Sequence, residues 1–113
     1  MPVIRLSVNR KLTFQQQISI KRELGKIIEI LPNKTEEKLM LHFEENQVMY
    51  YKGDEEPCSM TEITLFQQSP LKEKKEFIEA YSNMLTTITR IPADRQYACF
   101  HEHENFAKGP MFL

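Results

Sequence analysis

Short runs in which apolar and polar residues alternate predict the strands of this chain. Residues 3–8 form the first run, and residues 39–44 form a second one. Alternation with a period of two places successive side chains on opposite faces of a strand, so each run has one apolar face. A third strand is predicted at about 60–66 and a fourth at about 96–101, while residues 47–51 could add a short edge piece. The apolar face of the first run carries Ile4, Leu6 and Val8.

Two longer segments repeat apolar residues at spacings of three and four, which is typical of amphipathic helices. The first is capped by Thr13 and stopped by Pro32; the second starts at Ser69-Pro70 and ends near Ile91-Pro92. We expect the Thr13 and Ser69 hydroxyls to accept hydrogen bonds from free N–H groups of the first turns. The predicted buried positions are Phe14, Ile18, Leu24, Ile27, Ile28 and Leu31 in the first helix, and Phe77, Ile78, Tyr81, Leu85 and Ile88 in the second.

The order strand, helix, strand therefore occurs twice, and the second copy begins about 57 residues after the first. Each copy is a βαβ unit, whose two strands should be parallel. We predict one α/β (α+β) domain over residues 1–113, with a four-stranded mixed sheet and two helices on one face. The other face would carry a mixture suited neither to a core nor to solvent, which favours self-association. Its residues are Arg5, Ser7, Met40, His42, Tyr97 and Cys99.

Composition removes several classes of function. With 15 basic and 16 acidic residues interspersed, the net charge is −1, so neither nucleic acid nor an anionic membrane is an expected partner. No apolar run approaches the roughly 20 residues that span a bilayer, and the start of the chain lacks the pattern of a signal peptide. We therefore expect a cytoplasmic protein. Its two cysteines, Cys58 and Cys99, are expected to be reduced.

Pro2 is the first candidate for chemistry, because removal of Met1 would leave a secondary amine at the chain terminus. A free α-amine titrates at about pH 7.7–8.0, and partial burial or nearby cations lower that value. Such an amine can act as a general base near neutral pH. A proline at position two is also common in proteins without such a role, but the strand that begins at Val3 would hold this terminus in place.

An ordered set of residues resembles the macrophage migration inhibitory factor branch of the tautomerase superfamily, which includes D-dopachrome tautomerase. The resemblance covers essentially the whole chain. It rests on the Met-Pro start before a strand, on Lys34 after the first helix, on His42 in the second strand, on the segments 47–53 and 56–58, and on Arg90-Ile91-Pro92-Ala93-Asp94-Arg95-Gln96-Tyr97.

The resemblance implies a homotrimer of βαββαβ subunits with active sites at the subunit interfaces. It implies a keto–enol tautomerase for phenylpyruvate-like 2-keto acids, with no cofactor and no metal. Pro2 would be the catalytic base and Lys34 would bind the substrate carboxylate. Tyr97 of a neighbouring subunit would complete the pocket with Cys99, and Phe66 would form a wall. The alternative is a cytokine-like factor that acts through a protein receptor and leaves the cell without a signal peptide.

The chain also departs from the family pattern. Cys99 stands where the family often has asparagine, and a thiol is a much weaker hydrogen-bond donor. Phe66 stands where the family has an aliphatic residue in the pocket wall. The segment Cys58-Ser59-Met60-Thr61 keeps only one cysteine of the family's Cys-x-x-Cys motif, and dithiol oxidoreductase activity needs two thiols, so we do not expect that activity. Other reactions of the superfamily, such as hydration or dehalogenation of unsaturated acids, need further cationic residues. We do not identify such residues in this sequence.

Two other arrangements of residues are candidates for metal or thiol chemistry. His101 and His103 lie on one side of an extended segment and could bind zinc with a third ligand, although surface histidines are the commoner reading. Cys99 and His101 could form a thiol–base pair. Same-face neighbours on a strand are about 6–7 Å apart, so we expect no direct contact between them.

Overall fold

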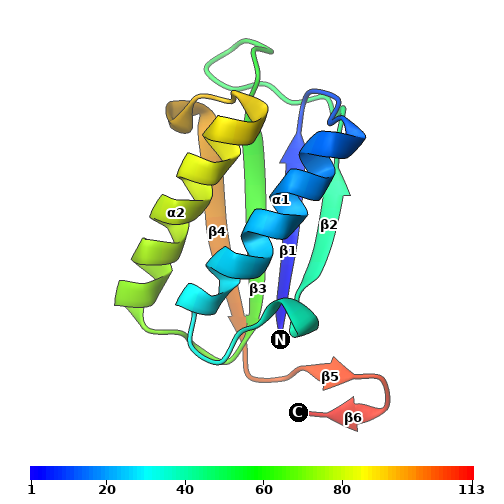
Figure 1. Ribbon diagram of the computed structural model, residues 1–113, viewed down its shortest axis with the longest axis vertical. Helices are drawn as coiled ribbons and strands as arrows, with labels where there is room; N and C mark the ends of the chain where they lie inside the picture. Colours follow the sequence, from blue (N-terminus) through cyan, green and yellow to red (C-terminus); the bar gives the residue numbers. More distant parts are fainter.

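A four-stranded mixed sheet forms the centre of the computed structural model, which describes all 113 residues (Figure 1). The strand order is β2-β1-β3-β4, with β1 parallel to β2 and antiparallel to β3, and β3 parallel to β4. The four main predicted strands are present and the sheet is mixed, as expected. The strands are β1 (Pro2–Val8), β2 (Met40–Glu44), β3 (Ser59–Phe66) and β4 (Gln96–His103).

Both helices cover the same face of this sheet (Figure 1). Helix α1 (Phe14–Ile27) continues into a 3₁₀ turn at Ile28–Ile30, and α2 (Leu71–Thr89) ends at Arg90. The predicted cap of α1 is confirmed: Thr13 Oγ1 accepts the Gln16 N–H at 3.0 Å, and the Gln16 side chain accepts the Thr13 N–H at 2.9 Å. This reciprocal pair satisfies two N–H groups that the first turn leaves free.

The two halves repeat each other in structure, as predicted. Strand β3 begins 57 residues after β1 (Ser59 against Pro2), and α2 begins 57 residues after α1 (Leu71 against Phe14). The alternating residues of β1 and β3 point towards the helices and form one core with them. Its fully buried members include Ile4, Leu6, Val8, Ile20, Leu24, Ile28, Leu31, Ile63, Leu65, Phe77 and Leu85.

Three local predictions are wrong. Ser69 does not cap α2: Pro70 occupies the N-cap, and the N–H of the buried Ser69 donates to the Glu102 carboxylate at 2.7 Å. Phe14 is 73% exposed, because it opens α1 beyond the helical turns that meet the core. Residues 47–51 form no strand, only an isolated bridge between Tyr51 and Asp54, because side chains outside the sheet hold this loop.

A small C-terminal hairpin lies below the sheet, beside the start of β1 (Figure 1). It consists of β5 (Ala107–Lys108) and β6 (Met111–Phe112), joined through Gly109 at φ +57°. The Leu113 N–H donates to the Phe106 carbonyl at 2.8 Å and closes the hairpin. Thus the two ends of the chain lie close together. No helix of this structure combines the length and apolar character needed to cross a membrane.

Candidate active site

A pocket of about 440 Å³ opens at the N-terminal end of β1, where the end of β3, the loop before β2 and the C-terminal hairpin meet. Its walls combine three apolar side chains, two amides and three lysines, and none of the lining residues is acidic. The lining residues are Met1, Asn33, Lys34, Lys38, Phe66, Gln67, Lys108 and Leu113.

The sheet places the start of the chain in this pocket. Pro2 is the first residue of the central strand β1 and pairs with Leu65 of the antiparallel β3. A proline lacks an N–H for the ladder, so the first position of a strand is one that it tolerates. The Met1 carbonyl accepts the Phe66 N–H at 3.3 Å, and Pro2 is buried. The terminus is therefore held by the strand rather than free to fray.

A tight turn brings Lys34 to the same place. The Lys34 N–H donates to the Leu31 carbonyl at 3.2 Å, with Pro32 and Asn33 as the central residues. Asn33 has φ +63°. Proline at the second position and a residue with positive φ at the third are the features of a type II turn, and asparagine accepts that conformation more readily than most residues. The turn that ends the first βα segment thus aims Lys34 at the pocket.

The electrostatics of the pocket favour a neutral amine. Burial lowers the pKa of the Met1 amino group, and the charges of Lys34 and Lys38 lower it further. The pKa of Lys34 is itself lowered, first by burial and then by Lys38. Each shift has the sign expected when like charges share a partly desolvated space. At neutral pH, a larger fraction of an amine at this position is therefore unprotonated than of an amine in open solvent.

The structure gathers only part of the predicted site within one chain. Lys34 and Phe66 line the pocket together with Met1, whereas Tyr97 and Cys99 do not. Pro2, the residue after Met1, is buried and is not itself part of the lining. Tyr97 pairs with Met60 on β3, five residues from the Leu65 that pairs with Pro2. At about 3.3 Å per residue this separation is about 17 Å along the strand. In one chain Tyr97 instead packs edge-to-face on Tyr51, with ring centroids 5.2 Å apart.

The sequence reasoning missed Lys38 and Lys108 as pocket residues. Lys38 ends a 3₁₀ turn at Glu36–Lys38, and the two glutamates before it suggest a local ion pair. Glu36 instead forms an ion pair with Lys21 of α1, with 3.7 Å between Glu36 Oε2 and Lys21 Nζ. Lys108 lies on the C-terminal hairpin, whose position no local pattern predicts. The only signal in the sequence is the apolar end of the chain, Met111-Phe112-Leu113, which is typical of a segment that packs against something. In one chain only Leu113 lines the pocket, whereas Met111 and Phe112 are 65% and 69% exposed.

The face of the sheet opposite the helices, here called the helix-free face, carries a charged network. Arg5 donates to Glu62 and also lies 3.3 Å from Glu44. The Arg5 hydrogen bond holds the pKa of the Glu62 carboxyl below its usual range. His101 Nε2 is 3.3 Å from Glu62 Oε1 and 3.3 Å from Cys99 Sγ. The prediction that Cys99 and His101 do not touch is therefore wrong, because their side chains lean towards each other along β4.

Glu62, Cys99 and His101 are the residues that could hold a metal ion. Their ligand atoms all lie within 4.8 Å of one another. Bonds of about 2.0–2.3 Å to tetrahedral zinc separate such atoms by about 3.3–3.6 Å, so the set suits zinc chemically. The structure groups His101 with these two residues and not with His103. Burial and the nearby Glu62 raise the pKa of the Cys99 thiol, so metal binding here has to displace a proton.

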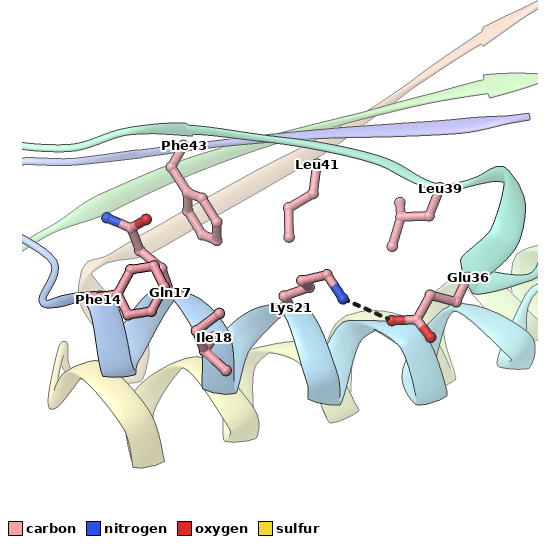
Figure 2. Close-up of a pocket in the computed structure, with 8 residues that line it drawn as sticks. All are labelled: Phe14, Gln17, Ile18, Lys21, Glu36, Leu39, Leu41 and Phe43. Atoms are coloured by element: carbon pink, nitrogen blue, oxygen red, sulfur yellow. Dashed lines mark ion pairs between the residues drawn. The ribbon is translucent and has the colours of Figure 1, made fainter.

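A second hollow, between α1 and β2, is an apolar groove without a base (Figure 2). Its volume is about 380 Å³, and its only charged residues, Lys21 and Glu36, pair with each other. The remaining lining residues are Phe14, Gln17, Ile18, Leu39, Leu41 and Phe43. Its charges are paired and it holds no candidate base, so the pocket at the start of β1 is the better candidate for proton chemistry.

Comparison with solved structures defines the class of the fold. MIF2 from Leishmania major superposes with a TM-score of 0.93 at 18% identity, over 100% of this chain and 97% of that one. The macrophage migration inhibitory factor of Toxoplasma gondii gives 0.84 at 17% identity, over 98% and 99% of the two chains. Pt0534, solved after inactivation by 2-oxo-3-pentynoate, gives 0.76 at 14% identity, over 89% and 85%.

The chain is thus an α+β protein with the fold of the macrophage migration inhibitory factor structures. The likeness to the Leishmania structure extends over the whole chain and confirms the predicted α+β fold of the single chain. No family model matches the sequence, and no curated protein matches it either. At 14–18% identity these structural likenesses establish the fold, and the chemistry has to be argued from the residues of this chain.

Proposed function

We propose that this protein is a tautomerase-superfamily isomerase of the macrophage migration inhibitory factor type. In this proposal it interconverts the enol and keto forms of a phenylpyruvate-like 2-keto acid without a cofactor. Pro2, exposed as a terminal secondary amine once Met1 is removed, is the base. Lys34 binds the substrate carboxylate, and Phe66 forms a wall of the pocket.

The proton transfer balances within the substrate and one amine. The neutral Pro2 nitrogen takes the proton from the enol hydroxyl, and the carbonyl forms as the carbon–carbon double bond becomes single. The protonated amine then returns a proton to the neighbouring carbon, which regenerates the base. Lys34 lowers the energy of the negatively charged intermediate and fixes the substrate orientation through a charge-assisted hydrogen bond.

The observation that carries the proposal is geometric: Lys34 and Lys38 line the pocket at the start of β1 without an acidic side chain beside them. Burial and these two charges lower the pKa of the amine at this end of the strand. The same surroundings would act on the Pro2 amine, one residue deeper in the strand. A base works best when its pKa lies near the operating pH, since it is then both neutral and basic enough to accept a proton. The inactivation of Pt0534 by a 2-keto acid supports the substrate class, because that protein shares this fold.

A homotrimer completes the proposal. Tyr97 is 61% exposed, and Val48 and Tyr50 of the neighbouring loop are 89% and 68% exposed. Large apolar and aromatic side chains exposed together favour contact with further copies of the chain. In the proposed trimer, Tyr97 and Cys99 reach the Pro2 pocket of the next subunit. Light scattering coupled to size-exclusion chromatography should give a mass near three chains, and a monomer would overturn this part.

The decisive experiment measures enol-to-keto conversion of 4-hydroxyphenylpyruvate by untagged protein that mass spectrometry shows to begin at Pro2. Pro2→Gly keeps a terminal amine but changes its basicity and geometry. We expect conversion by the wild type and a loss of at least 100-fold in the variant, in line with the usual contribution of a general base. Circular dichroism controls for folding. Equal inactivity of two folded proteins would overturn the proposal and leave the cytokine-like alternative.

A further inference from the structure

The Pro2 pocket holds more positive charge than a single carboxylate requires. Lys34, Lys38 and Lys108 all line it, and no acidic residue does. None of the three forms an ion pair, although the whole chain has a net charge of −1. The positive charge of the pocket is therefore not a reflection of a basic protein. It is a local excess, left without partners inside the chain.

Glu36, one of two glutamates close to these lysines in the sequence, is directed elsewhere. Glu36 lies between Lys34 and Lys38 along the chain, and it could have neutralised either one. Figure 2 shows its side chain over α1, where it pairs with Lys21 at 3.7 Å. The 3₁₀ turn at Glu36–Lys38 separates the two signs, with Glu36 facing the apolar groove and Lys38 facing the Pro2 pocket.

Lys34 and Lys38 lie close enough to act on each other, and Lys108 lines the same pocket. Lys38 lowers the pKa of Lys34, and both lower the pKa of the terminal amine. Such repulsion destabilises the empty pocket, and a bound anion removes it. One carboxylate, held by Lys34 in the proposed mechanism, leaves Lys38 and Lys108 still without a partner.

The rest of the lining does not suit a purely apolar ring. Besides the lysines, the pocket presents the amides of Asn33 and Gln67, and its apolar surface comes from Met1, Phe66 and Leu113. A bare phenyl group pushed against Lys38 or Lys108 would displace water from an ammonium group and return no hydrogen bond. A second anionic group at that end of the substrate would supply the missing partner.

We infer that this pocket takes a 2-keto acid carrying a second anionic group, which Lys38 and Lys108 bind while Lys34 binds the 2-keto carboxylate. The inference rests on the proposed tautomerase function and narrows its substrate class to dianions. Lys38 and Lys108 then determine specificity: they discriminate between substrates that share the same reacting atoms. A charge-assisted hydrogen bond corresponds to a preference of roughly 10- to 100-fold for the dianion.

The test compares probes that differ by one charge. The enol forms of phenylpyruvate and 4-carboxyphenylpyruvate are a matched pair, and enol-oxaloacetate is a shorter dianion. All three are followed by loss of enol absorbance with protein beginning at Pro2. We expect kcat/KM for at least one dianion to exceed that for phenylpyruvate by at least tenfold at low salt. The preference should shrink at high ionic strength.

Lys38→Gln and Lys108→Gln, singly and together, test the assignment, and Lys26→Gln on α1 is the matched control. The readout is the ratio of kcat/KM for dianion and monoanion, since any change in the amine pKa affects both probes alike. The double variant should reduce this ratio at least tenfold, and Lys26→Gln should leave it unchanged. An undiminished ratio, or equal rates for all probes, overturns the inference while the tautomerase stands.

Failure of the tautomerase proposal is recognised separately, because it abolishes turnover of every probe. Calorimetry with 4-carboxyphenylpyruvate and phenylpyruvate then still decides the inference, since it needs no catalysis. We expect the dianion to bind at least tenfold more tightly to the wild type, and this difference to disappear in the double variant. Equal affinities for the two probes would refute a second anion subsite.

Discussion

Thr61 of β3 and Tyr81 of α2 join the sheet to the second helix through a hydrogen bond of 2.6 Å between their hydroxyl oxygens. Both side chains are buried, at 0% and 2% exposure. Because both hydroxyls are buried away from water, each has the other as its hydrogen-bond partner. The hydrogen bond therefore forms only when α2 is correctly placed on β3.

Removing both hydroxyls should cost less than the two single removals added together. Tyr81→Phe leaves the Thr61 hydroxyl buried without its partner, which typically costs about 1–3 kcal/mol of unfolding free energy. Thr61→Val combined with Tyr81→Phe should lose less than the sum of the two single variants. Urea unfolding at one protein concentration measures all four proteins. Strictly additive losses would show that the hydrogen bond does not couple helix and sheet.

Tyr81 should also make the protein sensitive to alkali. Burial raises its pKa, and the hydrogen bond to Thr61 only partly offsets this. A group whose pKa is higher in the folded state stabilises the fold below its unfolded pKa, here about 10, and loses that contribution as the pH rises further. Unfolding free energy should therefore fall above about pH 10. The fall should be shallower in Tyr81→Phe, and identical profiles would contradict the assignment.

Lys34 should influence both substrate binding and the titration of the base. Lys34→Gln removes the proposed carboxylate partner, so kcat/KM should fall about 10- to 100-fold. It also removes a charge that lowers the pKa of the terminal amine. Because the base acts when neutral, the acidic limb of the pH–rate profile should move to higher pH. Lys34→Arg keeps the charge and should leave the limb in place, while Lys26→Gln serves as the distant control.

Glu102 should stabilise the connection between β3 and α2 in a pH-dependent way. Its carboxylate accepts the Ser69 N–H at 2.7 Å and the Lys74 ammonium at 2.9 Å. Burial alone would raise the pKa of Glu102, but these two hydrogen bonds outweigh it and lower the pKa. A lowered pKa stabilises the fold above the unfolded value, about 4.3, and this contribution disappears as the pH falls through the folded value.

Glu102→Gln tests this expectation. At pH 7 the variant should lose about 1–3 kcal/mol of unfolding free energy, the usual worth of hydrogen bonds to a charged group. The difference in unfolding free energy between the two proteins should narrow as the pH is lowered below about 4. The Glu102 carboxylate of the wild type then takes up a proton and becomes neutral, like the glutamine of the variant. A constant difference from pH 7 to pH 3 would show that the charge of Glu102 contributes nothing.

Asn9 should hold the long loop between β2 and β3. Its Nδ2 donates to the carbonyls of Glu55 and Glu56 at 3.1 and 3.0 Å, and its Oδ1 accepts the Cys58 N–H at 2.9 Å. Asn9→Ala leaves these backbone groups without partners, so we expect a loss of about 1–3 kcal/mol. Limited proteolysis should then cut within residues 47–57 faster than in the wild type. Unchanged cleavage would show that other contacts suffice.

The architecture was predictable because its signals are local. A period of two at residues 3–8, a period near 3.6 after Thr13, and the turn residues Pro32 and Gly53 each act within a few positions. The mispredicted details depend on distant partners. Ser69 lies one residue before the N-cap of α2, and its N–H is bound by the Glu102 carboxylate, 33 residues away. Residues 47–51 are held by Asn9 and Arg95 instead of a neighbouring strand.

The candidate site also contains residues that the sequence could place and residues that it could not. Pro2, Lys34 and Phe66 come together because strand register and one tight turn determine their positions, and local residues specify both. Tyr97 and Cys99 stay at a distance within the chain, since β4 pairs with β3 in a register that puts them further along the sheet. Their proposed role needs a second subunit, which no periodicity in one chain can position.

The sequence alone specified the strands, the helices and their order, because hydrophobic periodicity and turn chemistry are encoded over a few residues. The tertiary structure decided that Lys38 and Lys108 join Lys34 around the same pocket while Glu36 turns away to Lys21. Electrostatic character arises from charges that are close in space, and chain folding alone determines which of 31 charged side chains become neighbours.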